Sequence, residues 1–263
     1  MPMHASLSTP ALLAEAVAAN LLPLYFALLA GALALAASTL LSWRRLRPGG
    51  AASAARIASA GALGVGIASG AFALIAAAMS SGHALTEFDD ALVAALSATQ
   101  PADTLRVFAR LTHFGDTATL TALGIAGALL LAWRRHLVLA ATWAAAIAGN
   151  SLLNVSLKAL FERVRPVHDH GFTIESSWSF PSGHASGTVA AWGIAAYVLL
   201  RLLPSRWHLP VVLAAVTIAL TTAVSRVVLQ VHFASDVLAG MASGAAWLTL
   251  CITLSELLRR RVP

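Results

Sequence analysis

The chain has 263 residues, of which 59% are hydrophobic and only 11% are charged, and its formal net charge is +6. So little polar surface excludes an ordinary water-soluble globule, which could not cover its outside. Nucleic-acid binding is not indicated, because the basic residues occur in short clusters between apolar runs, as membrane anchors do. The single cysteine, Cys251, excludes an intramolecular disulfide and a cysteine-based metal site.

Seven apolar runs are long enough to cross a bilayer, and lipid offers no partner to an unpaired backbone group. We therefore predict an all-α fold, a polytopic transmembrane helix bundle. In chain order the predicted spans are 21–41, 57–79, 117–133, 137–157, 185–203, 209–224 and 237–258. Arginines follow the first run rather than precede it, so we expect a retained span and not a cleaved signal peptide.

Basic residues orient the predicted bundle. Most of them fall in alternate connections and at the C-terminus, which the positive-inside rule makes cytoplasmic: Arg44, Arg45, Arg47, Arg56, Arg134, Arg135, Arg201, Arg206, Arg259, Arg260 and Arg261. The other connections hold nearly all the acids and are expected to face outward: Glu87, Asp89, Asp90, Asp103, Asp116, Glu162, Asp169, Glu175 and Asp236. The N-terminus is then outside and the C-terminus inside.

The outer connection 88–114 carries two short amphipathic patterns separated by Pro101. We expect this stretch to lie on the membrane surface as a packing or anchoring segment, with a substrate gate as the alternative. Within the fourth span, Asn150 and Asn154 are spaced to bond neighbouring helices.

The first chemical motif is K-A-L-F-E-R-V-R-P, residues 158–166, where the fourth span leaves the membrane. Pro166 biases the residue before it away from helical geometry. Lys158 and Arg165 could then meet at one anion. Taken alone, they could equally be snorkelling or solvated anchors.

The second motif is F-P-S-G-H-A-S-G, residues 180–187, at the start of the fifth span. A helix N-terminus can hold a phosphate. Ser182 is of the type that caps a helix, Gly183 lets the backbone approach a ligand, and His184 is titratable beside them. A plain helix start with an interfacial histidine is the alternative.

The third motif is S-R-V-V-L-Q-V-H-F-A-S-D, residues 225–236, between the last two spans. His232 and Asp236 lie four residues apart and would share a helix face. The carboxylate could then accept the Nδ1 proton and leave Nε2 as a nucleophile. A structural polar pair is the alternative, although ionisable groups at the membrane margin usually serve function.

The three motifs occur in a fixed order and on one predicted membrane face: K-x6-R-P, then P-S-G-H, then S-R-x5-H-x3-D. Together they resemble the signature of the type 2 phosphatidic acid phosphatase family, which shares it with vanadium haloperoxidases. The resemblance covers about residues 118–258. It implies a six-helix phosphatase core, here within 57–263, preceded by an extra span and basic loop in 1–56.

The resemblance also implies roles. Phosphoryl oxygens would be held by Lys158, Arg165, Arg226, Ser182 and the Gly183 N–H. His232 would attack and form a phosphohistidine, Asp236 would orient it, and His184 would protonate the leaving group. We expect no metal and no cofactor, because the fixed cations take the place of magnesium. A metal cluster of His168, Asp169 and His170 is disfavoured by its spacing, and these residues with Glu175 are expected near the substrate entrance or in solvent.

The expected enzyme is a metal-independent phosphatase of a lipid phosphate or pyrophosphate at the periplasmic face of a bacterial inner membrane. Undecaprenyl pyrophosphate is favoured over phosphatidylglycerol phosphate, phosphatidic acid and lipid A phosphate. The expected partners are the lipid substrate and membrane lipids, without nucleic acid, and the sequence gives no oligomeric state. The rivals are a lipid flippase, a vanadate-dependent haloperoxidase, and a serine peptidase that would use Ser182 and His184 in poor geometry.

Overall fold

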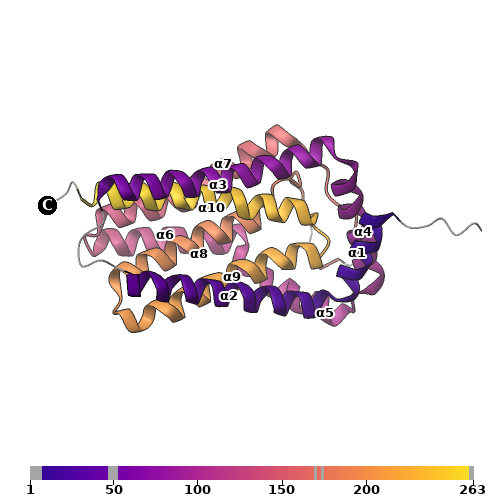
Figure 1. Ribbon diagram of the computed structural model, residues 1–263, viewed down its shortest axis with the longest axis horizontal. Helices are drawn as coiled ribbons and strands as arrows, with labels where there is room; N and C mark the ends of the chain where they lie inside the picture. The colour runs from indigo at the N-terminus through magenta and orange to yellow at the C-terminus, as the bar shows by residue number, and fades with distance from the viewer. Residues whose placement is uncertain (1–7, 47–52, 169–170, 173–174, 261–263) are drawn as a thin grey trace, which may run out of the picture.

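The computed structural model describes residues 8–46, 53–168, 171–172 and 175–260, and in these ranges the regular structure is helical (Figure 1). The predicted all-α class is therefore confirmed. The elements in order are α1 (Thr9–Ala19), α2 (Leu21–Leu46), α3 (Ala54–Ser81), α4 (His83–Thr99), α5 (Ala102–Leu111), the 3₁₀ turn η1 (Thr112–Gly115), α6 (Thr117–Trp133), α7 (Leu137–Phe161), α8 (Gly183–Leu202), η2 (Ser205–Trp207), α9 (His208–Val228) and α10 (Ala234–Leu258).

Seven helical stretches of the described chain are long and apolar enough to cross a membrane, which confirms the seven predicted spans and a multi-pass membrane protein. Several helices outrun their apolar runs, because a helix continues into flanking polar residues: α2 reaches Leu46 and α7 reaches Phe161. The third stretch runs from Ala102 to Trp133, since α5, η1 and α6 follow one another almost without a break, but its continuous apolar run is α6, the span predicted at 117–133.

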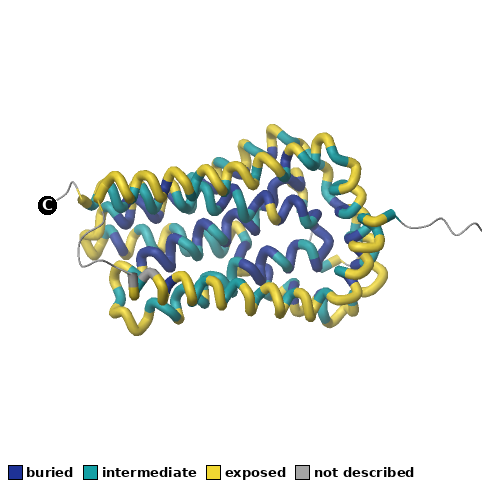
Figure 2. Tube along the Cα trace, viewed as in Figure 1, coloured by how far each residue is buried: buried dark blue, intermediate teal, exposed yellow. Residues whose placement is uncertain are grey.

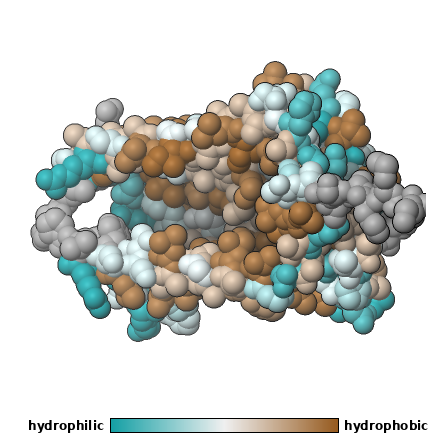
Figure 3. All heavy atoms as spheres, turned by 45° about the vertical axis from the view of Figure 1, so that its right-hand side comes forward, coloured by the Kyte–Doolittle hydropathy of each residue, from teal (hydrophilic) through white to brown (hydrophobic). Residues whose placement is uncertain are grey.

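The bundle is buried at its centre and apolar on its outside. In the most hydrophobic stretch of α8, 56% of the residues are buried inside the protein, against 6% in α2 and α3. Figure 2 shows the same pattern, with buried residues along α8, α9 and α10 and exposed residues along the flanking helices. Hydrophobic residues cover the middle of the face in Figure 3, and hydrophilic residues gather toward its two ends. An apolar exterior of this kind suits contact with lipid.

Small residues bring α10 against the first half of α8. A Cβ added at Gly240 would lie 2.5 Å from the carbonyl oxygen of Ser182, and one at Gly244 would lie 2.6 Å from that of Ser186. Membrane helices use such residues for close packing. The contact joins the second and third motifs, because the Ser182 N–H donates to the carbonyl oxygen of Asp236 at 2.9 Å.

One end of the bundle is covered by α1 and α4, which pack on each other (Figure 1). The predicted amphipathic segments are α4 and α5, with Pro101 between them. Their place on a membrane surface remains a prediction. Helix α1 was not predicted, although the Ser8 side chain caps it and a proline follows within its first turn.

The opposite end carries the predicted cytoplasmic arginines. Arg44 and Arg45 close α2, Arg201 lies near the end of α8, and Arg259 follows α10. Figure 1 shows these helix ends together, beside the C-terminus and away from α1 and α4. Arg47 and Arg261 lie outside the described residues. Of the two asparagines in the fourth span, Asn150 makes the predicted contact with a neighbouring helix, donating to the Ser186 hydroxyl of α8 at 3.4 Å, whereas Asn154 donates to the Pro181 carbonyl just before α8 at 3.2 Å.

Candidate active site

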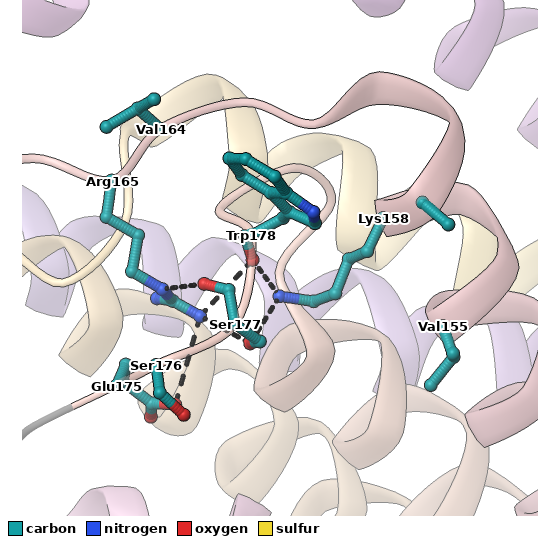
Figure 4. Close-up of a pocket in the computed structure, with 9 residues that line it drawn as sticks. Val155, Lys158, Val164, Arg165, Glu175, Ser176, Ser177 and Trp178 are labelled. Atoms are coloured by element: carbon teal, nitrogen blue, oxygen red, sulfur yellow. Dashed lines mark hydrogen bonds and ion pairs between the residues drawn. The ribbon is translucent and has the colours of Figure 1, made fainter.

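The first motif places one cation, Lys158, in the last turn of α7 and another, Arg165, on the loop that follows. Helix α7 ends at Phe161, and Glu162 follows in the left-handed region at φ 45°, which turns the chain toward Arg165. Lys158 is buried, and its Nζ donates to the Ser177 hydroxyl at 3.1 Å and to the Trp178 carbonyl. The Arg165 Nε donates to the Ser177 carbonyl at 2.6 Å. Both cations therefore converge on residues 177–178, as Figure 4 shows.

The second motif forms the start of α8. Ser182 is the N-cap, and its hydroxyl accepts from the Ala185 N–H at 3.4 Å. The Gly183 backbone lies so close to α7 that an added Cβ would be 3.0 Å from the amide oxygen of Asn154. One residue later, the His184 ring presents Nε2 to Asp116 at 3.0 Å and Nδ1 to Glu175 at 3.9 Å.

The third motif turns the chain between α9 and α10. Gln230 adopts a left-handed φ of 52° just beyond α9, and the N–H groups of Val231 and His232 donate back to the Arg226 carbonyl. Arg226 is fully buried, with Nη1 donating to Thr112 at 2.9 Å and Nη2 to Glu175. The turn thereby sets His232 beside the cations of the first motif.

His232 has a defined tautomer. The Arg165 Nη1 lies 3.0 Å from its Nε2, and because a guanidinium can only donate, Nε2 must carry the lone pair. The proton is then on Nδ1, which faces the Ser179 hydroxyl at 3.3 Å and Asp236 Oδ2 at 3.4 Å. Burial lowers the pKa of His232 to about 3, and nearby Arg165 adds to this against the pull of Asp236. The imidazole is therefore neutral.

Cations from different motifs converge on one carboxylate. Glu175 pairs with the buried Arg226, and its oxygens lie 3.8 Å from Arg165 and 3.9 Å from His184. The sequence analysis expected Glu175 at the entrance or in solvent. The structure places its carboxylate, with 24% of the side chain exposed, both on the wall of a cavity and in the cationic cup formed by Arg165, His184 and Arg226, because the loop that Lys158 and Arg165 hold carries it there (Figure 4).

A buried ionic network behind His232 was missed by the sequence analysis. Asp236 accepts from the Ser179 hydroxyl and from Arg163 Nη1 at 2.6 Å, and Arg163 Nη2 reaches Asp89 at 2.9 Å. Asp89 is fully buried and also accepts from the Ser235 N–H at 3.2 Å. Burial raises the pKa of Asp89, and its hydrogen bonds with Ser235 and Arg163 oppose that rise.

A signal for this network exists in the sequence. Asp89 lies three residues before Leu92 and seven before Leu96, so an acid stands on the apolar face of α4. Arg163 lies inside the first motif but between its two recognised cations. Ser179 directly precedes the second motif. Each position is visible in the sequence, but its partner is distant in the chain.

A cavity of about 490 Å³ lies beside the site. Polar groups from Lys158, Arg165 and the 175–177 loop line one part of it, and Val155, Ala159, Val164 and Trp178 line the rest (Figure 4). Among the described residues, no three His, Cys, Asp or Glu side chains gather as metal ligands. Asp169 and His170, from the disfavoured metal cluster, lie outside the described residues.

Known proteins resemble the chain in sequence and fold. Residues 137–260 match the sequence model of the PAP2 superfamily. Phosphatidylglycerophosphatase B from Bacillus subtilis (strain 168) is 33% identical over 202 residues, which cover 72% of this chain and 94% of that protein. Decaprenylphosphoryl-5-phosphoribose phosphatase from Mycobacterium tuberculosis (strain H37Rv) is 37% identical over 139 residues, covering 51% and 71%.

The fold has a solved counterpart. A crystal structure of a transmembrane PAP2-type phosphatidylglycerolphosphate phosphatase from Bacillus subtilis superposes with a TM-score of 0.67 at 29% identity, covering 76% of this chain and 98% of that one. The sequence similarity extends over nearly the whole of a phosphatase relative. This chain also has the membrane helices, and its three motifs meet at one site. The chain belongs to the PAP2 superfamily and is a multi-pass membrane lipid phosphatase.

Proposed function

We propose that this chain transfers the phosphoryl group of a membrane lipid phosphate to His232 and then to water, on the periplasmic side of a bacterial inner membrane. The observation that carries the proposal is the state of His232. Its Nε2 lone pair is directed at the cationic cup, where Arg165 now occupies it at 3.0 Å, and Ser179 and Asp236 face its Nδ1. A neutral imidazole held from behind in this way is a competent nucleophile.

The positions of the other groups suit the remaining steps. A phosphoryl group in the place of the Glu175 carboxylate would face Arg226, Arg165 and His184. Two guanidinium groups stabilise charge that spreads over phosphoryl oxygens during transfer. Lys158 stands at the other side of the 177–178 loop and would join them when the substrate displaces that loop.

Ser182 and Gly183 would contribute at the start of α8. The Ser182 N–H and hydroxyl are engaged within the fold. A hydroxyl that accepts a hydrogen bond can still donate its own proton, so the Ser182 hydroxyl and the Gly183 N–H, both at the start of α8, would each donate to a phosphoryl oxygen.

The substrate we place first is phosphatidylglycerol phosphate, since the relative that aligns over nearly its whole length is named for that activity. Undecaprenyl pyrophosphate, which the sequence analysis favours, is the second choice. The apolar part of the neighbouring cavity would accept the part of a lipid tail next to the phosphate.

Orientation follows from the charges. The site lies at the end of the bundle remote from Arg44, Arg45, Arg201 and Arg259, which the positive-inside rule places in the cytoplasm. The test is a single-cysteine protein, Cys251→Ser with Ser176→Cys, treated in intact spheroplasts with a membrane-impermeant maleimide. Labelling supports the periplasmic site, and labelling only after lysis refutes it.

Phosphate release is the test of the reaction. Detergent-purified protein is given phosphatidylglycerol phosphate, undecaprenyl pyrophosphate, phosphatidic acid and lipid A phosphate, in a chelator, because we expect no metal requirement. A ³²P-labelled substrate should leave an acid-labile phosphoenzyme on the wild type and on His136→Ala, an exposed histidine at the other end of the bundle. His232→Ala should trap none. Label trapped on that variant would refute the nucleophile, and lipid movement without phosphate release would favour a flippase.

A further inference from the structure

A fourth segment, residues 112–116, contacts the second and third motifs. It comprises η1 and the residue that follows it, and η1 packs against both α8 and α9. Thr112 is buried, and its hydroxyl accepts from Arg226 Nη1 at 2.9 Å. A Cβ added at Gly115 would lie 3.1 Å from the His184 ring. The segment lies outside the residues that match the superfamily model.

Asp116 ends this segment and begins α6. A residue at this position ordinarily caps its helix by accepting from amide groups of the first turn. In Asp116 both oxygens instead face imidazoles, with Oδ1 3.0 Å from His184 Nε2 and Oδ2 2.6 Å from His113 Nδ1. Its side chain therefore serves the site rather than the start of α6.

Two carboxylates and one guanidinium define the surroundings of His184. Asp116 of α6 faces its Nε2, Glu175 of the 175–178 loop faces its Nδ1 at 3.9 Å, and Arg226 of α9 acts on it as a nearby positive charge. Since Glu175 marks the place proposed for the phosphate, Nδ1 is the nitrogen directed at the substrate. The geometry is the reverse of that at His232, where Nδ1 is held from behind and Nε2 faces the cup.

We infer that Asp116 is a positioning residue that binds the Nε2–H of His184, so that the imidazolium presents its Nδ1 proton to the leaving group. The inference rests on the proposed function. As the His232 Nε2–P bond forms, the bond from phosphorus to the lipid oxygen breaks and that oxygen takes the Nδ1 proton. In the second step the neutral His184 takes a proton from the attacking water, phosphate leaves His232, and the starting charges return.

A carboxylate with this role is needed only when the leaving group requires a proton. A lipid alkoxide is a poor leaving group, whereas p-nitrophenolate departs without protonation. Asp116→Asn keeps the size of the side chain and an oxygen that can accept from Nε2, but it removes the charge. We therefore expect the variant to lower kcat/KM for the lipid phosphate by about 10- to 100-fold, within the range of general acid catalysis. For p-nitrophenyl phosphate, whose leaving group needs no proton, the loss of kcat/KM should be clearly smaller than for the lipid phosphate.

The control is Asp103→Asn, which removes an exposed carboxylate that pairs with Arg106 on α5. Asp116→Glu should recover part of the lipid activity. The alkaline fall of kcat/KM for the lipid substrate should begin at lower pH in Asp116→Asn, because an imidazolium without its carboxylate loses its proton more easily. The recovery in Asp116→Glu and the shifted alkaline fall both indicate a positioning role, because a folding defect would not move the pH profile.

The outcomes are distinct. Equal losses on both substrates, or an alkaline limb that does not move, would overturn the role of Asp116 while leaving the phosphatase intact. If the wild type releases phosphate from neither substrate, the proposed function fails and the inference fails with it. Selective loss on the lipid substrate together with the shifted limb supports both.

Discussion

Glu175 should compete with phosphate for the site. Glu175→Gln removes a carboxylate that pairs with the buried Arg226 and lies within 4 Å of Arg165 and His184. A hydrogen bond to a charged group contributes about 1.5–3 kcal/mol to the free energy of folding. Glu175 keeps 24% of its side chain exposed, which weakens the pair, so we take the lower end of this range. A ligand that no longer has to displace the carboxylate should bind roughly tenfold more tightly.

The assay is inhibition by vanadate and by inorganic phosphate, with the thermal shift that each anion produces in detergent. Without an anion, Glu175→Gln should unfold at a lower temperature than the wild type, because the variant leaves Arg226 without its carboxylate. With saturating anion the two should converge. Glu162→Gln, an exposed neutralisation just beyond α7, is the control. Anion affinity that is unchanged or weaker in Glu175→Gln would refute the competition and indicate that the carboxylate supports the site.

Three further variants and conditions test the surroundings of the site. Because its pKa is lowered to about 3, His232 should stay neutral and cause no loss of kcat/KM between pH 7 and 5. The rates are first corrected for the ionisation of the substrate, measured by ³¹P NMR. A remaining fall in kcat/KM centred near pH 6.5 would contradict this. Gly240→Ala should cost about 1–3 kcal/mol of stability and lower activity, because its Cβ would overlap a backbone carbonyl of the second motif, whereas at Gly66 the described residues leave room for the same change. Equal melting temperatures of the two alanine variants would refute that reading. Arg163→Met should cost about 3–5 kcal/mol by leaving two buried carboxylates unpaired, and Arg106→Met, which breaks an exposed pair, should cost far less.

The spans and motifs were predictable because their signals are local. A run of about 20 apolar residues identifies a membrane helix without reference to the rest of the chain. His232 Nδ1 and Asp236 Oδ2 lie 3.4 Å apart, but the two residues do not share a helix face as their spacing of four predicted. His232 precedes α10, and Asp236 in the first turn of that helix reaches back to it while accepting from the Phe233 N–H at 3.0 Å. The predicted tautomer, with the lone pair on Nε2, stays a prediction that the contact with Arg165 supports. What the sequence did not give was the group that fixes it, the guanidinium of Arg165.

The missed residues depend on contacts between distant parts of the chain. Asp89 and Arg163 are 74 residues apart, and Asp116 and His184 are 68 apart. Asp89 was predicted to lie in a segment on the membrane surface because the sequence pattern of α4 is amphipathic. An acid on an apolar face is a recognisable anomaly, but only the fold shows that the cation that satisfies it also binds Asp236.

Apart from the His184 imidazolium that the proposed reaction requires, the free site is balanced in charge, and the way each carboxylate is held explains why Glu175 is the group that a substrate would displace. Four cations (Lys158, Arg163, Arg165 and Arg226) lie among four carboxylates (Asp89, Asp116, Glu175 and Asp236). Asp89 and Asp236 are fully buried and fixed by backbone and side-chain donors, and Asp116 is held between two imidazoles. Glu175 instead is carried by a loop and bound by the groups that would hold phosphate. A phosphoryl group with a charge of about −1.5 to −2 that replaces it adds little net charge to a desolvated site, and the cations keep a partner throughout.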